Sequence, residues 1–397
     1  MKIIEIGTGY TPIPAQMGAA TEIVVEELTR AFLKIGQDVE IIDIAAQKRA
    51  ETDLPISEVK VPRIFTKTDV SLGIMHKLKR VFYSIALARY LKKRLKKEQE
   101  KVVLHFHNQY NLFFFLKLVS KKLRQKALIA YTNHSHVWHG EWDVIKDIVK
   151  KRYFQEIFCM KQANCVFVLN EKTISNIKKK VQIDPEKIFL IDNGVNASVY
   201  HILTEEEKIE NKKLYGLSNK KVFIQIGSIC ERKNQLTSIR LLTPLLKQDC
   251  NLLYCYAGGI ISDEYQECIQ QYAIQNGIKD QVIYMGEIPP GKQLNKIYNL
   301  AEAMLFPSIA EGFSLTILEA MAAGVPVVIH QNLQFKLADK CLKYFDEENC
   351  LITIKENLLN KTKQEELSLY ARETVLDAYG WSKIANDYLK VWQEGKE

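Results

Sequence analysis

The sequence reads Phe306-Pro-Ser-Ile-Ala-Glu-Gly-Phe-Ser-Leu-Thr-Ile-Leu-Glu-Ala-Met-Ala-Ala-Gly-Val-Pro-Val-Val328 in its most informative stretch. An apolar run ends at Phe306, and a loop with Glu311 and Gly312 follows it. We predict a helix from near Ser314 to Gly324, where a glycine is typical of a helix end. A second apolar run then begins. The stretch is therefore a strand–loop–helix–strand unit of the kind that builds parallel sheets.

The loop and helix of this stretch carry groups that suit a diphosphate ligand. Gly312 lets the backbone approach a ligand closely, and a helix N-terminus offers free N–H groups and a partial positive charge. Glu311 lies before the helix and Glu319 inside it, so two carboxylates could hold sugar and ribose hydroxyls on either side of a diphosphate. Taken alone, these residues also fit a capping box of Thr316 and Glu319 beside a solvated Glu311.

The same alternation of strands and helices continues on both sides. Strands are predicted in the second half at Lys221–Ile226, Asn251–Ala257, Val282–Met285, Ala303–Phe306 and Val325–Ile329. In the first half they are predicted at Lys2–Ile6, Val39–Ile44, Val102–His107, Ala127–Thr132, Cys165–Leu169 and Ile188–Ile191. Helical sequence separates them, which predicts two doubly wound parallel sheets joined near residues 194–218. Ligands are expected beyond the C-terminal ends of the strands.

Composition describes an ordinary globular protein with an uneven charge. Hydrophobic residues make up 47% of the sequence and charged residues 26%, which is typical of a globular protein. The length of 397 residues suits two domains. The first ten residues enter a strand directly, so we expect no signal peptide, and no apolar run reaches the ~20 residues of a membrane span. Residues 1–195 carry 33 Lys and Arg against 21 Asp and Glu, whereas residues 196–397 carry 22 against 26.

The basic charge is densest in Lys77–Lys101, which contains ten basic and two acidic residues. Such a segment attracts phosphates, anionic lipid or nucleic acid. Apolar residues recur in it at near-helical spacing, namely Leu78, Val81, Phe82, Ile85, Leu87, Ala88, Leu91 and Leu95. The segment is either a solvated surface helix or an interfacial helix that rests on anionic lipid. Nucleic acid is not expected, because nothing resembles a base-reading motif.

The stretch from Phe306 closely resembles the donor-binding signature of family 4 glycosyltransferases, which are retaining enzymes of the GT-B fold. In that signature seven residues separate two glutamates, as they separate Glu311 and Glu319. Further segments match motifs of the family in the same order, namely Ile191–Val195, Gln225–Gly227, Lys233–Asn234, Ala257–Gly259, Val282–Gly286 and Tyr379–Ile384. The resemblance covers nearly the whole chain.

The resemblance implies an α/β chain with the GT-B fold, in which two Rossmann-like domains with parallel sheets face each other. Residues 1–195 would form the acceptor-binding domain, together with residues 383–397 of a C-terminal helix that crosses back to it. Residues 196–382 would form the domain that binds the nucleotide sugar. The implied activity is retaining transfer of a hexose from a UDP-sugar, or secondly a GDP-sugar, to a glycan or lipid-linked acceptor in the synthesis of cell-surface polysaccharide or glycoconjugate.

The resemblance also implies residues for the donor site. Lys233 maps onto the diphosphate lysine of the family. The family usually carries an arginine shortly after the glycine of the phosphate turn, but here Ser228 follows Gly227, and Arg232 is the candidate replacement. The expected donor-binding residues are Gly18, Arg232, Lys233, Glu311, Gly312, Phe313, Ser314, Leu315 and Glu319, and the expected catalytic residues are Lys233, Glu311 and His134.

Histidines mark the candidate site of the first domain. His134 follows the predicted strand Ala127–Thr132 and resembles the histidine that the family places beside the anomeric centre, although a lone histidine also fits a structural role. His105 and His107 share one face of a strand. Because His107 is nearer the strand's end, we expect it and His136, in the loop after His134, to contact the acceptor.

Neither a metal nor a cofactor is expected. Fixed cations can stabilise the charge that develops on a leaving diphosphate, and neither a DxD motif nor a His/Asp cluster stands in a suitable place. The acidic pair Asp263-Glu264 fits a helix N-terminus. A metal site of three histidines around His134 has no support from residue spacing.

Three alternatives accompany this interpretation. A sugar-nucleotide epimerase of the same fold would need acid and base carboxylates and no acceptor. A catalytically silent GT-B protein would bind only a glycan or a partner. A nicotinamide dehydrogenase is disfavoured because Gly7-Thr-Gly9 lacks a third glycine with a helix directly after it. The expected location is the cytoplasm, with the inner face of the cell membrane as a candidate docking surface through Lys77–Lys101.

Overall fold

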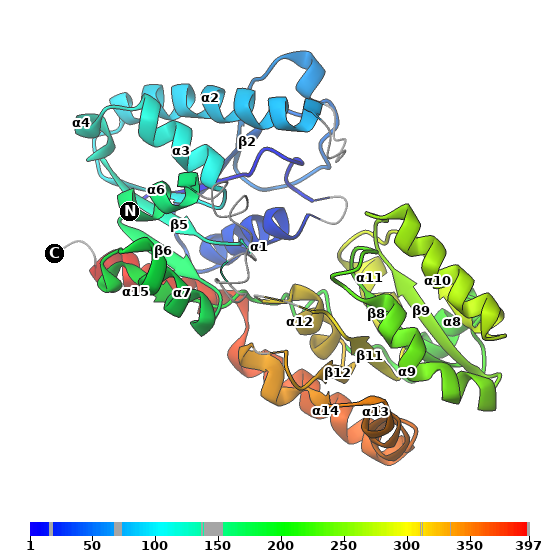
Figure 1. Cartoon of the computed structure of the whole chain (residues 1–397). Helices are drawn as coiled ribbons and strands as arrows, with labels where there is room; N and C mark the ends of the chain where they lie inside the picture. Colours follow the sequence, from blue (N-terminus) through cyan, green and yellow to red (C-terminus); the bar gives the residue numbers. More distant parts are fainter. Residues whose placement is uncertain are drawn as a thin grey trace. The chain divides into compact units, whose positions relative to one another are not determined.

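The computed structural model describes residues 1–15, 19–66, 74–135, 138, 154–309, 311, 313–333 and 335–394. It divides into two compact units, coloured along the chain in Figure 1. The first unit is Met1–Asn193 with Trp381–Glu397, and the second is Gly194–Gly380. The boundaries expected from the sequence, after residues 195 and 382, each lie two residues beyond these crossings.

The first unit contains a seven-stranded sheet of order β3-β2-β1-β4-β5-β6-β7, in which every described pairing is parallel. Its strands are β1 (Ile3–Ile6), β2 (Val39–Ile44), β3 (Ile56–Val59), β4 (Val102–Phe106), β5 (Ala127–Thr132), β6 (Cys165–Val168) and β7 (Ile188–Leu190). Only β3 was not predicted. It is an edge strand with polar residues in its middle, so it lacks the apolar run of a buried strand.

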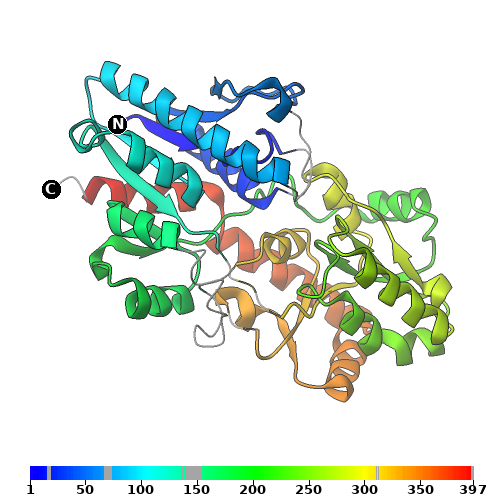
Figure 2. The same ribbon diagram turned by 45° about the horizontal axis from the view of Figure 1, so that its top comes forward.

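The helices of the first unit cover both faces of this sheet, as the two ribbon views show (Figures 1 and 2). They are α1 (Ala20–Lys34), η1 (Arg63–Phe65), α2 (Ile74–Lys97), α3 (Gln109–Leu118), α4 (Lys121–Arg124), α6 (Phe154–Gln162), α7 (Glu171–Val181), η4 (Pro185–Lys187) and α15 (Trp381–Glu394). The C-terminal helix α15 packs beside α1, where the rings of Phe32 and Trp392 are 5.5 Å apart. The prediction that the last helix returns to the first domain is confirmed.

Alternation along the strands of the first unit separates an apolar face from a polar one. Ile4 and Ile6 of β1, with Leu104 of β4, enter the core that contains residues of α2 and α3. The intervening residues Glu5 and His105 must therefore point to the opposite face. The ring of His105 lies there, 5.4 Å from the ring of Trp392 on α15.

The second unit contains a six-stranded sheet of order β10-β9-β8-β11-β12-β13. Its strands are β8 (Lys221–Ile226), β9 (Leu252–Ala257), β10 (Val282–Tyr284), β11 (Ala303–Phe306), β12 (Val327–His330) and β13 (Leu342–Tyr344). Its helices are α8 (Glu205–Leu214), α9 (Gln235–Gln248), α10 (Asp263–Gln275), η5 (Lys279–Gln281), α11 (Lys292–Tyr298), α12 (Leu315–Ala322), η6 (Lys336–Lys340), α13 (Glu347–Thr353), η7 (Ile354–Leu358) and α14 (Lys361–Ala378). The strand β13, another short edge strand, was not predicted.

Each sheet has one point where the strand order reverses. These points lie between β1 and β4 in the first unit and between β8 and β11 in the second. The connections leave such a pair of strands in opposite directions, which opens a crevice beyond their C-terminal ends where ligands bind. His107 follows β4 in the first unit, and the loops with Lys233 and Glu311 follow β8 and β11 in the second. The fold thus brings the predicted residues to two ligand-binding positions.

Candidate functional site

Two adjacent strands of the second unit end in glycines that let their backbones come close together. Gly227 after β8 has φ +147° and Gly258 after β9 has φ +144°. A Cβ atom on Gly258 would collide with the backbone carbonyl of Gly227. A residue with a side chain would therefore not fit at position 258. The glycine there lets the backbones after β8 and β9 lie close together where the chain turns after β8.

The loop after β8 is held by the side chain of Gln225, a buried residue of that strand. Its side-chain amide donates to the carbonyl of Lys233 at 2.7 Å. Its side-chain oxygen accepts hydrogen bonds from Ser238 at 2.6 Å and Tyr254 at 2.9 Å. This buried network holds the backbone of Lys233 in place. Gln225 belongs to a motif found in the sequence, but its role in holding the loop was not predicted, because Ser238 and Tyr254 lie outside that motif.

Three side chains converge on one oxygen atom of Glu311. The Oε1 atom accepts hydrogen bonds from Lys233 Nζ at 2.7 Å, Arg232 Nη1 at 2.8 Å and Ser308 Oγ at 2.6 Å. Burial raises the pKa of Glu311, but the charge of Lys233 and the hydrogen bonds from Lys233 and Ser308 outweigh burial and lower that pKa. The side chain is thus a carboxylate that holds two cations at one point.

The cluster places two cations at one carboxylate. Among the described residues, both Lys233 and Arg232 form ion pairs with Glu311. Lys233 is largely buried and lies 5.0 Å from the centre of the Phe306 ring. A fixed cation in such surroundings interacts more strongly with a phosphate than it would in water.

The helix α12 begins directly after this cluster. Ser314 is its N-cap, and the Ser314 hydroxyl accepts a hydrogen bond from the N–H of Ile317 at 3.4 Å. The alternative of a capping box between Thr316 and Glu319 is therefore wrong, because the helix begins two residues earlier than that box requires. The N-terminal turn leaves backbone N–H groups without intrahelical partners, as an anion site needs.

Glu319 lies inside α12 with its side chain buried. The hydroxyl of Tyr298, at the end of α11, lies 3.0 Å from Glu319 Oε2 and 3.3 Å from the carbonyl of Thr316. Tyr298 thus orients the second glutamate of the signature. The sequence carried no signal for this contact, since Tyr298 lies on a separate helix.

The structure brings together part of the predicted donor site. Arg232, Lys233 and Glu311 are in direct contact, and Phe313, Ser314 and Leu315 occupy the start of α12. Arg232 was the candidate replacement for the arginine that the family carries after the glycine of the phosphate turn. It lies five residues after Gly227, and its guanidinium contacts Glu311. The predicted residues Gly18, Gly312 and His136 lie outside the described residues.

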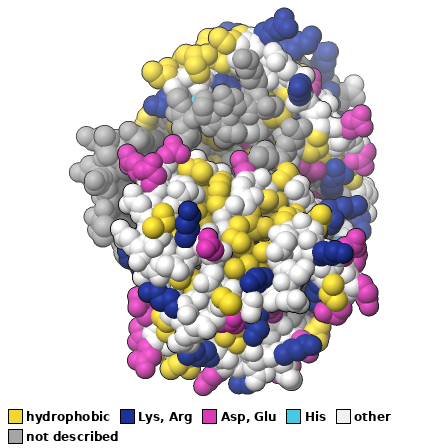
Figure 3. All heavy atoms as spheres, turned by 90° about the vertical axis from the view of Figure 1, so that its right-hand side faces the viewer, with side chains coloured by type: hydrophobic (Ala, Val, Ile, Leu, Met, Phe, Trp, Pro, Cys, Tyr) yellow, Lys and Arg dark blue, Asp and Glu magenta, His cyan; other side chains and the backbone are white. Residues whose placement is uncertain are grey.

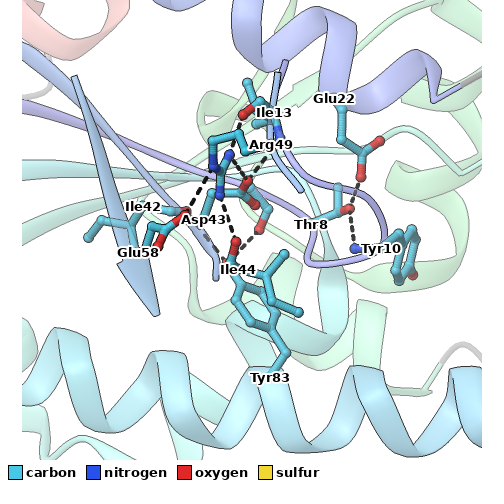
Figure 4. Close-up of polar contacts among 11 residues, drawn as sticks. Thr8, Tyr10, Ile13, Glu22, Ile42, Asp43, Ile44, Arg49, Glu58 and Tyr83 are labelled. Atoms are coloured by element: carbon cyan, nitrogen blue, oxygen red, sulfur yellow. Dashed lines mark hydrogen bonds and ion pairs between the residues drawn. The ribbon is translucent and has the colours of Figure 1, made fainter. Parts of the chain in front are cut away.

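The loop after β1 in the first unit is held by many hydrogen bonds (Figure 4). The Asp43 carboxylate accepts from the backbone N–H of Ile13 at 2.9 Å and from Arg49 at 2.8 Å. Thr8 contacts the buried Glu22 at the start of α1. Burial raises the pKa of Glu22 to about 7. Among the described residues of this loop, Thr8 and Ile13 are thus held by buried carboxylates.

A buried carboxylate joins two of the histidines at the other switch point. Glu5 pairs in register with His105 across β1 and β4. Its Oε1 atom lies 3.0 Å from His105 Nδ1, and its Oε2 atom lies 2.7 Å from His107 Nε2. The Nδ1 atom of His107 lies 3.0 Å from Nε2 of the half-buried His134. Both ring nitrogens of His107 are therefore engaged by side chains, and its predicted contact with the acceptor stays a prediction.

Glu5 was missed in the sequence analysis. A charged residue inside an otherwise apolar strand such as Ile3–Ile6 is a usable signal, because a buried charge needs a partner. Among the described residues, Glu5, His105 and His107 also form the group that could hold a metal ion. However, Glu5 contacts the histidines at 2.7 and 3.0 Å, whereas two ligands on one tetrahedral zinc are ~3.3 Å apart. These distances favour hydrogen bonds.

A second buried carboxylate anchors the segment that carries His134. Glu156 on α6 accepts hydrogen bonds from Tyr131 at 2.7 Å, Asn133 at 2.7 Å and Trp138 at 2.9 Å. Burial raises the pKa of Glu156 to about 7, against the opposing effect of these bonds. Because the donors lie on both sides of His134, they limit the positions that its backbone can adopt.

The helix α2 has an exposed face that changes character along its length. The apolar side chains at its beginning are exposed, namely Ile74, Met75, Leu78, Val81 and Phe82. Toward its end the exposed side chains are basic, namely Arg89, Lys92, Lys93, Lys96 and Lys97. Leu78, Val81 and Phe82 thus do not belong to a buried stripe with Leu87 and Leu91, as their spacing suggested. Hydrophobic and basic side chains also lie near one another at the top of Figure 3.

The fold and the strand-end sites define a class of protein. Two parallel sheets flanked by helices, with the last helix returning to the first unit, form the GT-B fold. Sucrose-phosphate synthase from Thermosynechococcus elongatus has this fold with a TM-score of 0.76 at 19% identity, over 99% of this chain and 98% of that one. HepE from Anabaena, solved with UDP and glucose, has a TM-score of 0.74 at 13% identity over 99% of both chains.

Family models identify the family. Residues 21–199 match the model described as Glycosyltransferase Family 4, and residues 207–336 match the model described as Glycosyl transferases group 1. The chain belongs to the family 4 glycosyltransferases, as the motifs around Glu311 and Glu319 indicated.

Relatives with assigned names are distant in sequence. Mannosylglucosylglycerate synthase of Thermotoga maritima is 25% identical over 88% of this chain and 90% of its own. The O-antigen chain mannosyltransferase of Salmonella typhimurium is 26% identical over 55% of this chain and 60% of its own. For the latter and two other relatives, the matched segment spans 59–61% of the relative's length.

Proposed function

We propose that this protein is a retaining glycosyltransferase that moves a hexose from a nucleoside-diphosphate donor to a glycan or lipid-linked acceptor. The observation that carries the proposal is the convergence of Lys233 and Arg232 on Glu311 beside the start of α12. A UDP-sugar is the first choice of donor and a GDP-sugar the second. The UDP and glucose bound to the structurally similar HepE support this choice.

Each group of the cluster has a role in the proposed reaction. Lys233 and Arg232 stabilise the charge that develops on the leaving diphosphate, and the first turn of α12 offers backbone N–H groups to the same oxygens. Glu311 holds hydroxyls of the transferred sugar, and Glu319 holds the ribose. His134 is the proposed catalytic residue of the first unit. The leaving diphosphate itself takes the proton of the acceptor hydroxyl, so neither a separate base nor a metal is required.

A thermal-shift screen tests the donor proposal. UDP, GDP, ADP and their sugars are added to the protein with and without EDTA, because a ligand of the folded state raises Tm. We expect UDP or UDP-sugars to raise Tm most, equally with EDTA, and to raise it less in Lys233→Ala. A shift that is lost in EDTA and restored by Mg²⁺ or Mn²⁺ would contradict metal independence. The absence of any nucleotide-dependent shift would contradict the donor site.

The same reagents separate the alternative functions. An epimerase would convert a sugar nucleotide without an acceptor, and a silent binding protein would bind nucleotide or glycan without turnover. A glycosyltransferase releases the nucleoside diphosphate in proportion to the glycosylated product. We expect this stoichiometric release, measured with a panel of glycan and lipid-linked acceptors.

We also propose that α2 docks the first unit on an anionic membrane and so gives the enzyme access to a lipid-linked acceptor. None of the described helices is both long and apolar enough to cross a bilayer. The exposed face of α2 instead joins apolar residues such as Leu78 and Phe82 to a row of lysines. Apolar side chains can enter the interface while each lysine near anionic headgroups contributes ~1 kcal/mol.

Vesicle co-sedimentation tests the membrane proposal. We expect the protein to sediment with anionic but not neutral vesicles, and to be released at 1 M salt, where the Debye length falls to ~3 Å. Two variants should weaken binding: one with Lys92, Lys93, Lys96 and Lys97 changed to Gln, and one with Leu78, Val81 and Phe82 changed to Ser.

A matched variant controls for the loss of charge alone. It changes four exposed lysines elsewhere in the first unit to Gln, namely Lys121, Lys122, Lys178 and Lys179. We expect this variant to bind vesicles nearly as well as the unchanged protein. If the α2 variants still sediment fully, α2 is a solvated surface helix and the acceptor is reached without it.

A further inference from the structure

Glu5 joins histidines that lie a hundred residues away in the sequence. The side chains of Glu5, His105 and His107 are fully buried. One carboxylate oxygen faces His105 Nδ1 and the other faces His107 Nε2, at 3.0 and 2.7 Å. A buried carboxylate is stable only with such partners, and as an acceptor it requires an N–H on each ring nitrogen that faces it.

The charge state of this group follows from its surroundings. Burial raises the pKa of Glu5, but the field of His105 and the hydrogen bonds from His105 and His107 outweigh burial and lower that pKa to about 2. Glu5 is therefore an ionised acceptor at neutral pH. Burial and the neighbouring His105 lower the pKa of His107 to about 4, against the opposing effect of Glu5, so His107 is neutral.

These charge states determine the tautomer of His107. A neutral imidazole carries one N–H, and a carboxylate can only accept. The N–H of His107 is therefore on Nε2, which faces Glu5, and its Nδ1 atom is an acceptor. His134 Nε2 lies 3.0 Å from that acceptor, so it donates. Burial lowers the pKa of His134 as well, which leaves its Nδ1 atom with a lone pair.

The other branch of the network is consistent with this pattern. The Glu5 carboxylate accepts from His105 Nδ1 at 3.0 Å, and His105 Nε2 lies 2.7 Å from the hydroxyl oxygen of Thr132. The oxygen of Thr132 lies 3.2 Å from the hydroxyl of Tyr388 on α15, which can donate to it. Each contact of the network can thus pair one donor with one acceptor.

We propose that Glu5 is a positioning residue for His134. Through His107 it holds His134 in the tautomer that keeps a lone pair on Nδ1, ready to accept a hydrogen bond from a substrate hydroxyl. The contact between His134 and a substrate hydroxyl rests on the proposed glycosyltransferase function. The hydrogen-bond pattern of Glu5, His107 and His134 does not rest on that function, so the pattern and the contact can be tested separately.

Nitrogen NMR of ¹⁵N-histidine-labelled protein tests the pattern without any substrate. The ¹⁵N shifts distinguish protonated from unprotonated ring nitrogens, and His107→Gln and His134→Gln assign the signals among the eight histidines. We expect His107 and His134 to be neutral Nε2–H tautomers at pH 7. In Glu5→Leu both should become mixtures of tautomers. An Nδ1–H tautomer of His134, or spectra that Glu5→Leu leaves unchanged, would overturn the proposal.

A second variant keeps the test informative if Glu5→Leu does not fold. Glu5→Gln has nearly the same shape but offers one acceptor and one donor, so it cannot accept from both rings. At least one of His105 and His107 can then no longer donate to residue 5. If both keep their hydrogens toward residue 5, the proposal fails. Glu22→Gln removes another buried carboxyl of the same unit and should leave these histidine signals unchanged.

Kinetics test whether Glu5 acts through His134. We expect Glu5→Leu to lower kcat about 10- to 100-fold, the range seen for partners that orient metal-bound histidines, with the KM for donor nearly unchanged. In a His134→Gln background the same change should have little further effect, because the group that it positions is gone. Additive losses would show a structural role and contradict the proposal.

Two remaining outcomes have separate meanings. Stoichiometric zinc in the purified protein, with metal-shifted nitrogen signals from His105 and His107, would replace the hydrogen-bond pattern by a metal site and overturn the proposal. The expected tautomers in a protein without glycosyltransferase activity would support the network. That result would contradict only the proposed function.

Discussion

Replacing Lys233 by alanine is expected to lower kcat at least ~100-fold, the usual scale for removing one preorganised stabiliser of developing charge. The Nζ atom of Lys233 lies 2.7 Å from Glu311, and Gln225 holds the backbone carbonyl of the same residue. A cation fixed in this way needs no reorganisation when the diphosphate leaves. Steady-state kinetics at saturating donor measure the effect.

Two further variants show whether the effect is specific. Lys343 forms an exposed ion pair with Asp339 in the same unit, so Lys343→Ala should leave kcat unchanged. Arg232→Ala should have a smaller effect than Lys233→Ala, since the Arg232 side chain is 42% exposed against 11% for Lys233. A Lys233→Ala variant with the kcat and Tm of the unchanged protein would contradict the diphosphate role.

The fold could be predicted where buried strands appear in the sequence as apolar runs. Central strands such as β4, β5 and β8 are buried on both faces, so they are continuous apolar runs bounded by turns. The strands β3 and β13 lie at sheet edges and are short and partly exposed. They lack the contrast between apolar and polar residues that marks a strand. The missed strands are therefore edge strands with a charged residue inside, Glu58 in β3 and Lys343 in β13.

The donor site was partly predictable because its main residues belong to local motifs. Lys233 follows one strand end and Glu311 another, and each motif can be found without knowing the other. Their contact joins residues 78 positions apart, and the contact between Glu5 and His105 joins residues 100 positions apart. Supporting residues such as Tyr298 have no motif of their own. Only the folded chain shows which partners they meet.

The helix α2 shows a different limit. Apolar residues occur on more than one of its faces, so helical spacing alone does not tell the packed face from the exposed one. In the structure Leu87 and Leu91 are buried, whereas Leu78 and Phe82 are exposed. The charge of the segment pointed to a membrane surface, and the exposed apolar residues add an independent reason for that proposal.

Replacing Glu319 by alanine is expected to weaken binding of the nucleoside diphosphate about 10- to 100-fold, the equivalent of a hydrogen bond to a charged group. Glu319 is buried on α12, and Tyr298 orients its carboxylate at 3.0 Å. A contact to the ribose is made equally before and during the reaction, so its loss should raise KM more than it lowers kcat. Isothermal titration calorimetry with UDP and GDP measures the affinity.

Two comparisons test the assignment of the two glutamates. Tyr298→Phe keeps the ring but removes the hydroxyl that orients Glu319, so it should weaken binding less than Glu319→Ala does. Glu311→Ala should have the opposite effect to Glu319→Ala: it should lower kcat more than it lowers the affinity for the nucleoside diphosphate, because sugar contacts orient the reacting centre. Unchanged UDP and GDP affinity in a folded Glu319→Ala variant would remove Glu319 from the ribose site, whatever the kinetics of the other variants.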